Sequence, residues 1–314
     1  MSSIQTPVGE ELEALGRLLL RPGPFTTQDA IDEGATYSWL RRWCAGGLLA
    51  HPVRGVYHAP DLPDDLDLRL TVLTLVVPPD CVVTDRTAGW LWGANMILAP
   101  GDHLTTPAVR VFCPPGYRLR NGLVASGERR LAPEDVAVVG GVRVTTPLRT
   151  ACDLGRLLHV DQALAAMDSL ARLGRFSLDH LALETARFRR YRGVVQLREL
   201  VPLVDPGAQS PGESALRLRW AQAGIPRPQC QVPVPAPGGG RFYIDLGIES
   251  RRFGAEYDGD DFHGPDEEEH DRRRRDWCRR EENWTILVFR RENVYGHEQD
   301  ADRILRQAWE NHPK

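Results

Sequence analysis

Three carboxylates recur along two apolar stretches near the end of the chain. Asp245 lies in RFYIDLGIE, and Glu256 and Asp258 lie in FGAEYDG. If the stretches form a hairpin that turns between positions 250 and 251, Asp245 faces Glu256. The two-residue alternation of strands then places the three carboxylates on one face, and Ile244 and Leu246 on the other. Like charges opposite one another destabilise a sheet, so the pattern predicts a compensating cation, and a divalent metal is the simplest one.

This carboxylate set is suited to the hydrolysis of a phosphodiester. Mg²⁺ or Mn²⁺ takes hard oxygen ligands, so Asp245 with Glu256 or Asp258 is the expected metal-binding pair. His263, with an ordinary pKa near ~6.5, is the expected general base or acid. Glu213, near the start of GESALRLRWAQAG, is expected to hold a second metal ion or to orient a metal-bound water.

Arginines follow the carboxylates in the run DRRRRD at 271–276. Arg274 and Arg275 are expected to contact backbone phosphates. Lysine is excluded from the chemistry, because Lys314 is the one lysine in the sequence. The alternatives are structural: the arginines pair with the acidic run at 266–269 on a solvated helix, His263 caps a helix, and the carboxylates lie on the surface.

Residues 210–296 resemble the restriction-endonuclease-like fold, and within it the very-short-patch repair (Vsr-like) endonucleases. The resemblance rests on Glu213, Asp245, the phrase DGDDFH that ends at His263, the run DRRRRD and the stretch WTILVF. It implies an α/β/α domain with a mixed central sheet and Mg²⁺-dependent endodeoxyribonuclease activity. The lysine of the PD-(D/E)xK motif is absent, and Asp258 stands in its place.

The first 60 residues have the element order of a winged helix-turn-helix. GEELEALGRLLL, PFTTQDAIDEG and ATYSWLRRWCAGG predict three short helices, and LLAHPVRGVYHAP predicts two strands around a turn at Pro52–Gly55. Thr36 is the expected N-cap of the third helix, which should end at Gly46 and Gly47. The segment from Phe25 to Tyr57 resembles the N-terminal domain of AbiEi-family antitoxins.

Such a domain normally places its third helix in the major groove of DNA. The expected DNA contacts are Tyr37, Ser38, Arg41 and Arg42 on this helix and Arg54 on the wing. Residues 1–60 carry five basic and six acidic side chains, so the segment is not basic overall. The alternative is that the domain binds another protein.

Residues 61–205 predict a mixed α/β middle region. The phrases TDRTA at 84–88 and TPLRTACD at 146–153 resemble the middle of the same antitoxin-like proteins, without a known catalytic role. Prolines and glycines between Pro206 and Gly212 mark a linker. We therefore expect an α+β multidomain protein with domains at 1–60, 61–205 and 206–314.

Composition narrows the class of protein. The chain has 314 residues, a net charge of -4, and neither an apolar run of membrane-spanning length nor a signal-peptide pattern at its start. Its six cysteines include no CxxC pair, which argues against a zinc ribbon and a disulfide framework. A cytoplasmic protein with buried thiols, which neither spans nor binds a membrane, is the expectation.

Three functional hypotheses follow. The leading one is a metal-dependent DNA endonuclease joined to an antitoxin-like DNA-binding module, acting in phage defence or DNA processing. The alternative is a non-catalytic AbiEi-like repressor or antitoxin with a degenerate nuclease fold, whose partners are DNA and a cognate toxin. The third is a protein-interaction scaffold. The presence of Asp245, Glu256, Asp258 and His263 together favours the first.

Overall fold

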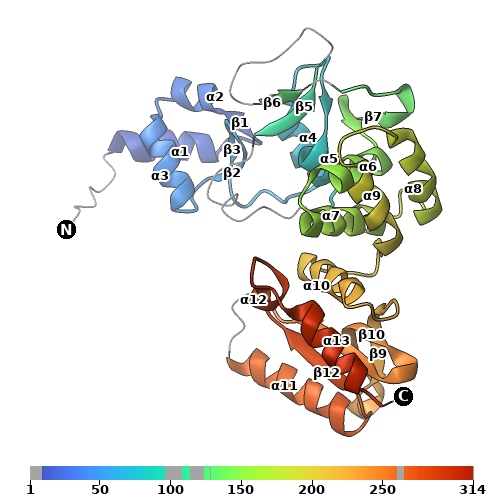
Figure 1. Ribbon diagram of the computed structural model, residues 1–314. Helices are drawn as coiled ribbons and strands as arrows, with labels where there is room; N and C mark the ends of the chain where they lie inside the picture. The colour runs from blue at the N-terminus through green and yellow to red at the C-terminus, as the bar shows by residue number, and fades with distance from the viewer. Residues whose placement is uncertain (1–8, 96–107, 114–123, 128, 260–264, 314) are drawn as a thin grey trace. The chain divides into compact units, whose positions relative to one another are not determined.

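The computed structural model describes residues 9–95, 108–113, 124–127, 129–259 and 265–313 (Figure 1). The chain forms two compact units, Met1–Gly93 with Leu98–Thr150, and Ala94–Ile97 with Ala151–Lys314. Both units contain helices and strands, so the expected mixed α+β class is confirmed. The three domains at 1–60, 61–205 and 206–314 stay a prediction.

The first unit begins with three helices and a small antiparallel sheet. In chain order the elements are α1 (Gly9–Leu19), β1 (Phe25–Thr26), α2 (Thr27–Asp32), α3 (Tyr37–Ala45), β2 (Ala50–Val53) and β3 (Val56–His58). The strands lie in the order β1-β3-β2. Thr36 caps α3 by accepting a hydrogen bond from the Trp39 N–H, and the helix ends at Gly46, as expected. Leu40 and Trp43 of α3 pack into the core of this segment.

A five-stranded mixed sheet forms the rest of the first unit. Its elements are α4 (Leu66–Thr74), β4 (Val82–Val83), α5 (Asp85–Leu91), β5 (Val109–Phe112), β6 (Val124–Gly127), β7 (Val136–Val139) and β8 (Val142–Thr145). The strands lie in the order β6-β5-β4-β8-β7. Buried valines from β4, β5 and β8 pack with Val72 and Leu73 of α4 and Leu91 of α5. Helix α6 (Pro147–Leu157) leads into the second unit.

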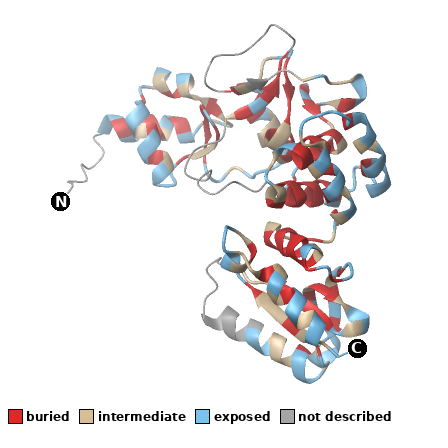
Figure 2. Cartoon of the chain, in the orientation of Figure 1, coloured by how far each residue is buried: buried red, intermediate tan, exposed pale blue. Residues whose placement is uncertain are grey.

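The second unit continues with the helices between α6 and the last sheet. They are α7 (Val160–Arg172), α8 (Leu178–Glu184), α9 (Val194–Leu200) and α10 (Pro211–Gln222). The nine residues from Gly212 to Trp220 are all buried, and Figure 2 shows α10 as a buried helix over most of its length. A helix buried all round has neighbours on every side. Here α7 lies on one side, and the last sheet and α13 lie on the other.

The chain ends in a four-stranded mixed sheet with helices on both faces. Its elements are β9 (Gln229–Pro235), β10 (Arg241–Ile248), β11 (Phe253–Tyr257), α11 (Pro265–Arg280), β12 (Thr285–Phe289), α12 (Arg291–Val294) and α13 (Ala301–Asn311). The strand order is β12-β11-β10-β9, and only the β11–β12 pair is parallel within it. One apolar cluster joins the sheet to α10 and α13, and another joins it to α11.

Strands β10 and β11 pair in the predicted register. Leu246 lies opposite Ala255, and Ile248 lies opposite Phe253. The turn is a short 3-10 helix at Glu249–Arg251, followed by a residue in the left-handed conformation. The hairpin inferred from the spacing of its residues is therefore confirmed.

The predicted alternation of faces fails at Asp245. Leu246 packs in the cluster beneath α10 and α13, whereas Ile244 packs in the cluster beneath α11. On a regular strand, residues two positions apart lie on the same face. Because Ile244 and Leu246 lie on opposite faces, the strand is irregular at Asp245. Gln231 of β9, which lies opposite Asp245 in the register of the flanking pairs, has a φ of 54°. The expectation that Ile244 and Leu246 share a face was wrong, because this irregularity shifts the alternation by one residue.

Gly193 makes the tightest backbone contact in the second unit. It precedes α9 with a φ of +77°, and a Cβ atom built on it would lie 1.7 Å from the carbonyl oxygen of Arg156. We predict that Gly193→Ala lowers the free energy of unfolding by more than about 3 kcal/mol. Gly174 has a φ of +65° but open space around it, so Gly174→Ala should cost only about 1–2 kcal/mol. Urea denaturation of both variants checks this. Equal losses of unfolding free energy would contradict a clash between the Cβ atom at position 193 and the Arg156 carbonyl oxygen.

Candidate functional site

Two of the predicted catalytic carboxylates lie in one partly buried environment between α10 and β10. Glu213 is buried, and its Oε2 accepts hydrogen bonds from the backbone N–H of Gln209 at 2.9 Å and from Gln231 Nε2 at 3.0 Å. The Oδ2 of Asp245 accepts from the backbone N–H of Tyr257 at 2.9 Å. Gln231 therefore lies between Glu213 and the strand position of Asp245.

The charge of Asp245 is disfavoured in this environment. Burial raises the pKa of Asp245 to about 7, and the nearby carboxylates of Glu213 and Glu256 add to the rise. The Tyr257 N–H and the Arg274 guanidinium oppose it, without cancelling it. Near neutral pH this carboxyl is therefore protonated in a large fraction of the molecules.

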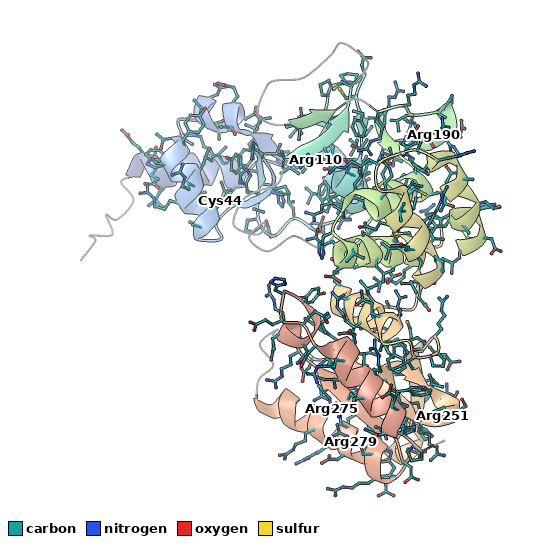
Figure 3. All side chains as sticks on the ribbon, viewed as in Figure 1. Cys44, Arg110, Arg190, Arg251, Arg275 and Arg279 are labelled. Carbon is teal, nitrogen blue, oxygen red and sulfur yellow. The ribbon has the colours of Figure 1, made fainter. Side chains whose placement is uncertain are left out.

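The other two carboxylates are neutralised by arginine. Glu256 is 2% exposed, and Arg274 donates to both of its oxygens, each at 2.9 Å. Arg275 donates to Glu256 Oε2 at 2.9 Å and to Asp258 Oδ2 at 3.1 Å. Both arginines come from α11, where Figure 3 labels Arg275. The compensating cation that the carboxylates require is thus present in the chain itself.

This arrangement does not fit the expected metal pair. Both oxygens of Glu256 are held by guanidinium groups, so they are not directed at a common ion. No group of three or more His, Cys, Asp or Glu side chains among the described residues is placed to hold a metal ion. His263, the expected general base or acid, lies outside the described residues. Arg274 and Arg275, expected to bind phosphate, hold the carboxylates in this structure, and their contact with phosphate stays a prediction.

Removing either arginine should destabilise the protein, because Glu256 would keep a buried charge with one partner fewer. We predict that Arg274→Ala and Arg275→Ala each cost about 2–3 kcal/mol of unfolding free energy. Arg272 and Arg273 lie on the same helix and are exposed. Their alanine variants should stay within about 0.5 kcal/mol of wild type. Denaturant titrations of the four variants test this. Equal losses of unfolding free energy in all four would show that the ion pairs of Arg274 and Arg275 with Glu256 do not contribute to stability.

The raised pKa of Asp245 predicts a dependence of stability on pH. An aspartate in an unfolded chain has a pKa near ~3.9. Between about pH 4 and pH 7 the folded protein binds more protons at this group, so its contribution to stability is complete below about pH 4 and is lost as the pH rises through 7. Asp245→Asn should therefore be more stable than wild type at pH 8, by at most about 4 kcal/mol, with a smaller difference at pH 5. Glu249→Gln, at an exposed position, is the control, and identical pH profiles for wild type and Asp245→Asn would refute the assignment.

The expected DNA-contact residues lie on α3 and the β2–β3 turn. Tyr37 is 69% exposed, and Ser38, Arg41 and Arg54 are exposed as well. Arg42 is also exposed at the surface, but its Nη2 donates to both carboxylate oxygens of Glu11 in α1, at 2.8 and 2.9 Å. Arg42 therefore ties α3 to α1.

Two ion pairs that sequence reasoning missed join α10 to α7. Arg217 pairs with Asp168, and Arg219 pairs with Asp161, and all four side chains are buried. The partners are 49 and 58 residues apart, so no local pattern indicates them. Desolvation raises the pKa of Asp168, and Arg217 opposes that rise. These pairs show that α10 packs against the preceding helices as closely as against the sheet that follows it.

Comparison with known proteins defines the class. Residues 81–203 match the family model of the AbiEi antitoxin C-terminal domain. Two uncharacterized proteins from two strains of Mycobacterium tuberculosis are each 32% identical to the chain over 235 residues, which is 74% of this chain and 82% of theirs. The chain belongs to the same family as these mycobacterial proteins, and its residues 81–203 are similar to the AbiEi antitoxin C-terminal domain.

The comparison confirms the antitoxin resemblance of the middle region and leaves the resemblances of residues 25–57 and 210–296 as predictions. The antitoxin-like phrases at 84–88 and 146–153 fall inside the matched segment. The matched segment ends at residue 203, before the nuclease-like region at 210–296 begins. In the part of the chain that the structure describes, no helix is long and apolar enough to cross a membrane.

Proposed function

We propose that this protein is a non-catalytic, DNA-binding regulator of the AbiEi antitoxin type, acting in a toxin–antitoxin or abortive-infection system. The match of residues 81–203 to the AbiEi antitoxin C-terminal domain is the observation that carries the proposal. It favours the antitoxin hypothesis over the endonuclease hypothesis. A cognate toxin protein is the partner that such a domain implies.

The first 58 residues are proposed to be a winged helix-turn-helix that binds DNA. The order of α1, α2, α3, β2 and β3 supports this proposal, as do the exposed side chains of Tyr37, Ser38 and Arg41 along α3. A helix in the major groove reads base edges with such side chains, while arginines at its ends and on the wing contact phosphates. Arg54 on the β2–β3 turn is placed for the second role.

The last sheet is proposed to serve stability and binding without catalysing hydrolysis. Phosphodiester cleavage by two carboxylates and a metal needs both carboxylates ionised and directed at the ion. Here Glu256 and Asp258 are held by Arg274 and Arg275. These contacts support a nuclease-like sheet that has exchanged its metal for arginines.

Binding to DNA tests the regulatory role. We predict that Arg41→Ala weakens binding of the full chain to a fragment carrying its own promoter and lowers the magnitude of the salt slope, d log K/d log[salt], by about 1. Arg280→Ala, an exposed arginine at the end of α11, should change neither quantity. Fluorescence anisotropy at several salt concentrations measures both. A wild-type affinity that does not depend on salt, or on Arg41, would contradict DNA binding through α3.

Cleavage of plasmid DNA tests the competing enzyme hypothesis. The full chain is incubated with supercoiled plasmid and Mg²⁺ or Mn²⁺, with EDTA as the control. The proposal predicts no nicking above the control, because the carboxylates are already neutralised. Metal-dependent nicking that is lost in Asp245→Asn would overturn the proposal and establish the endonuclease.

A further inference from the structure

Two buried cysteines meet at one end of the five-stranded sheet. Cys81 directly precedes β4, and Cys113 directly follows β5, and they are 3% and 7% exposed. Their Sγ atoms lie 2.7 Å apart. They are 32 positions apart in the sequence, so the contact is a product of strand pairing.

The pairing of β4 and β5 fixes this contact. Val82 lies opposite Phe112 and Val83 lies opposite Val111, so the antiparallel register places Cys81 opposite Cys113. The Thr84 N–H donates to the Arg110 carbonyl, and hydrogen-bonded and non-hydrogen-bonded pairs alternate along such a ladder. The cysteines therefore occupy a non-hydrogen-bonded position, where the Cα atoms of a pair are about 4.5 Å apart.

This geometry is compatible with a disulfide bond. Disulfides join residues whose Cα atoms are about 4.4–6.8 Å apart, and their sulfur atoms are about 2.05 Å apart. The two sulfur atoms therefore need to approach by less than about 1 Å, and β4 and β5 can keep their register. The Cys81 N–H donates to the Pro78 carbonyl, so a cross-link removes no hydrogen bond between the strands at this position.

The environment of Cys81 disfavours its thiolate. Burial raises the pKa of Cys81 to about 12, and the contact with Cys113 adds to the rise. A thiolate is the species that attacks a disulfide, so the closed structure reacts slowly. Pro79 and Asp80, which precede Cys81, are exposed, so the buried cysteine pair lies next to the protein surface.

We propose that Cys81 and Cys113 form a reversible disulfide site whose co-reactant is a low-molecular-weight disulfide. One cysteine thiolate attacks the small disulfide, forming a mixed disulfide and releasing one small thiolate. The second cysteine then attacks the protein sulfur of that mixed disulfide, forming the Sγ–Sγ bond and releasing the second small thiolate. Both cysteines lose a proton and are oxidised, and the small disulfide is reduced to two thiols. The proposal is independent of DNA or toxin binding.

The cross-link would fix the first strand of the antitoxin-like domain to β5. Cys81 is the first residue of the segment that matches the AbiEi antitoxin C-terminal domain. A bond between residues 81 and 113 closes a loop over the intervening chain, which restricts the unfolded state and so stabilises the folded one. Oxidation is therefore expected to raise the Tm by several degrees.

Thiol counting on the full chain tests the site. The protein is equilibrated with mixtures of oxidised and reduced glutathione, alkylated under denaturing conditions and weighed by mass spectrometry. We expect alkylation to fall from six thiols to four, with peptide mapping that assigns the bond to Cys81 and Cys113, and return to six after reduction. Cys81→Ser and Cys113→Ser should each abolish the bond, whereas Cys152→Ser, a buried cysteine on α6, should retain it.

Several results would overturn the proposal. They are six alkylated thiols at every glutathione ratio, a bond mapped to another pair, or an intramolecular disulfide that persists in Cys81→Ser. Mapping of the wild-type protein needs no variant, so it decides the question even if a serine variant fails to fold. A mixed disulfide with glutathione that never resolves would also refute the proposal, because it would show that the two sulfur atoms do not reach one another.

Discussion

The second unit depends on the burial of α10 between two layers. Arg217 and Arg219 project from this helix toward α7, and each meets an aspartate in the interior. A buried ion pair adds little net stability over an apolar pair, but a buried charge without its partner is costly. The two pairs therefore fix which face of α10 meets α7, and Trp220 and Leu216 on the helix are left to pack against the last sheet. The position of Glu213 at the beginning of α10 follows from the same constraint.

The carboxylates near this helix differ in how their negative charges are compensated. Glu256 and Asp258 form ion pairs with guanidinium groups from α11. The charge of Asp245 is only partly compensated, so protonation lowers the cost of burying this side chain. Gln231 donates a hydrogen bond to Glu213, and the backbone N–H of Tyr257 donates one to Asp245. A metal ion would have to displace these partners before it could hold the same oxygens. Glu256 and Asp258 thus take part in the packing between the sheet and α11, whereas Glu213 and Asp245 lie between α10 and β10.

In the first unit, helix caps and strand pairing determine where the short helices and strands lie. The side chains of Thr26 and Asp29 cap α2 reciprocally, and Thr36 caps α3, so the turns between these short helices are set locally. The five-stranded sheet instead joins distant segments, since β4 pairs with both β5 and β8. That pairing brings Cys81 and Cys113 together, and it also forms the beginning of the antitoxin-like domain.

Local chemistry in the sequence determined much of this protein. The caps at Thr36 and Gly46, the helices around them and the register of the β10–β11 hairpin follow from residue types and spacing, because each depends on neighbours within a few positions. Short sequence motifs in the middle region also indicated its similarity to the AbiEi antitoxins. The sequence likewise showed that the carboxylates of β10 and β11 need a compensating cation.

Only the tertiary structure showed that two arginines face these carboxylates. Arg274 and Arg275 are 18 and 19 residues from Glu256, and whether a helix arginine faces the sheet depends on how α11 packs, which no spacing rule fixes. The irregularity at Asp245 lies where the pairing of β10 with β9 is interrupted. The ion pairs of α10 are made with a helix more than 40 residues away in the sequence. The reason is the same in each case. A charged side chain or a strand residue pairs with a group that is close in space but distant in the sequence. The sequence shows the types of both residues but not that they lie together.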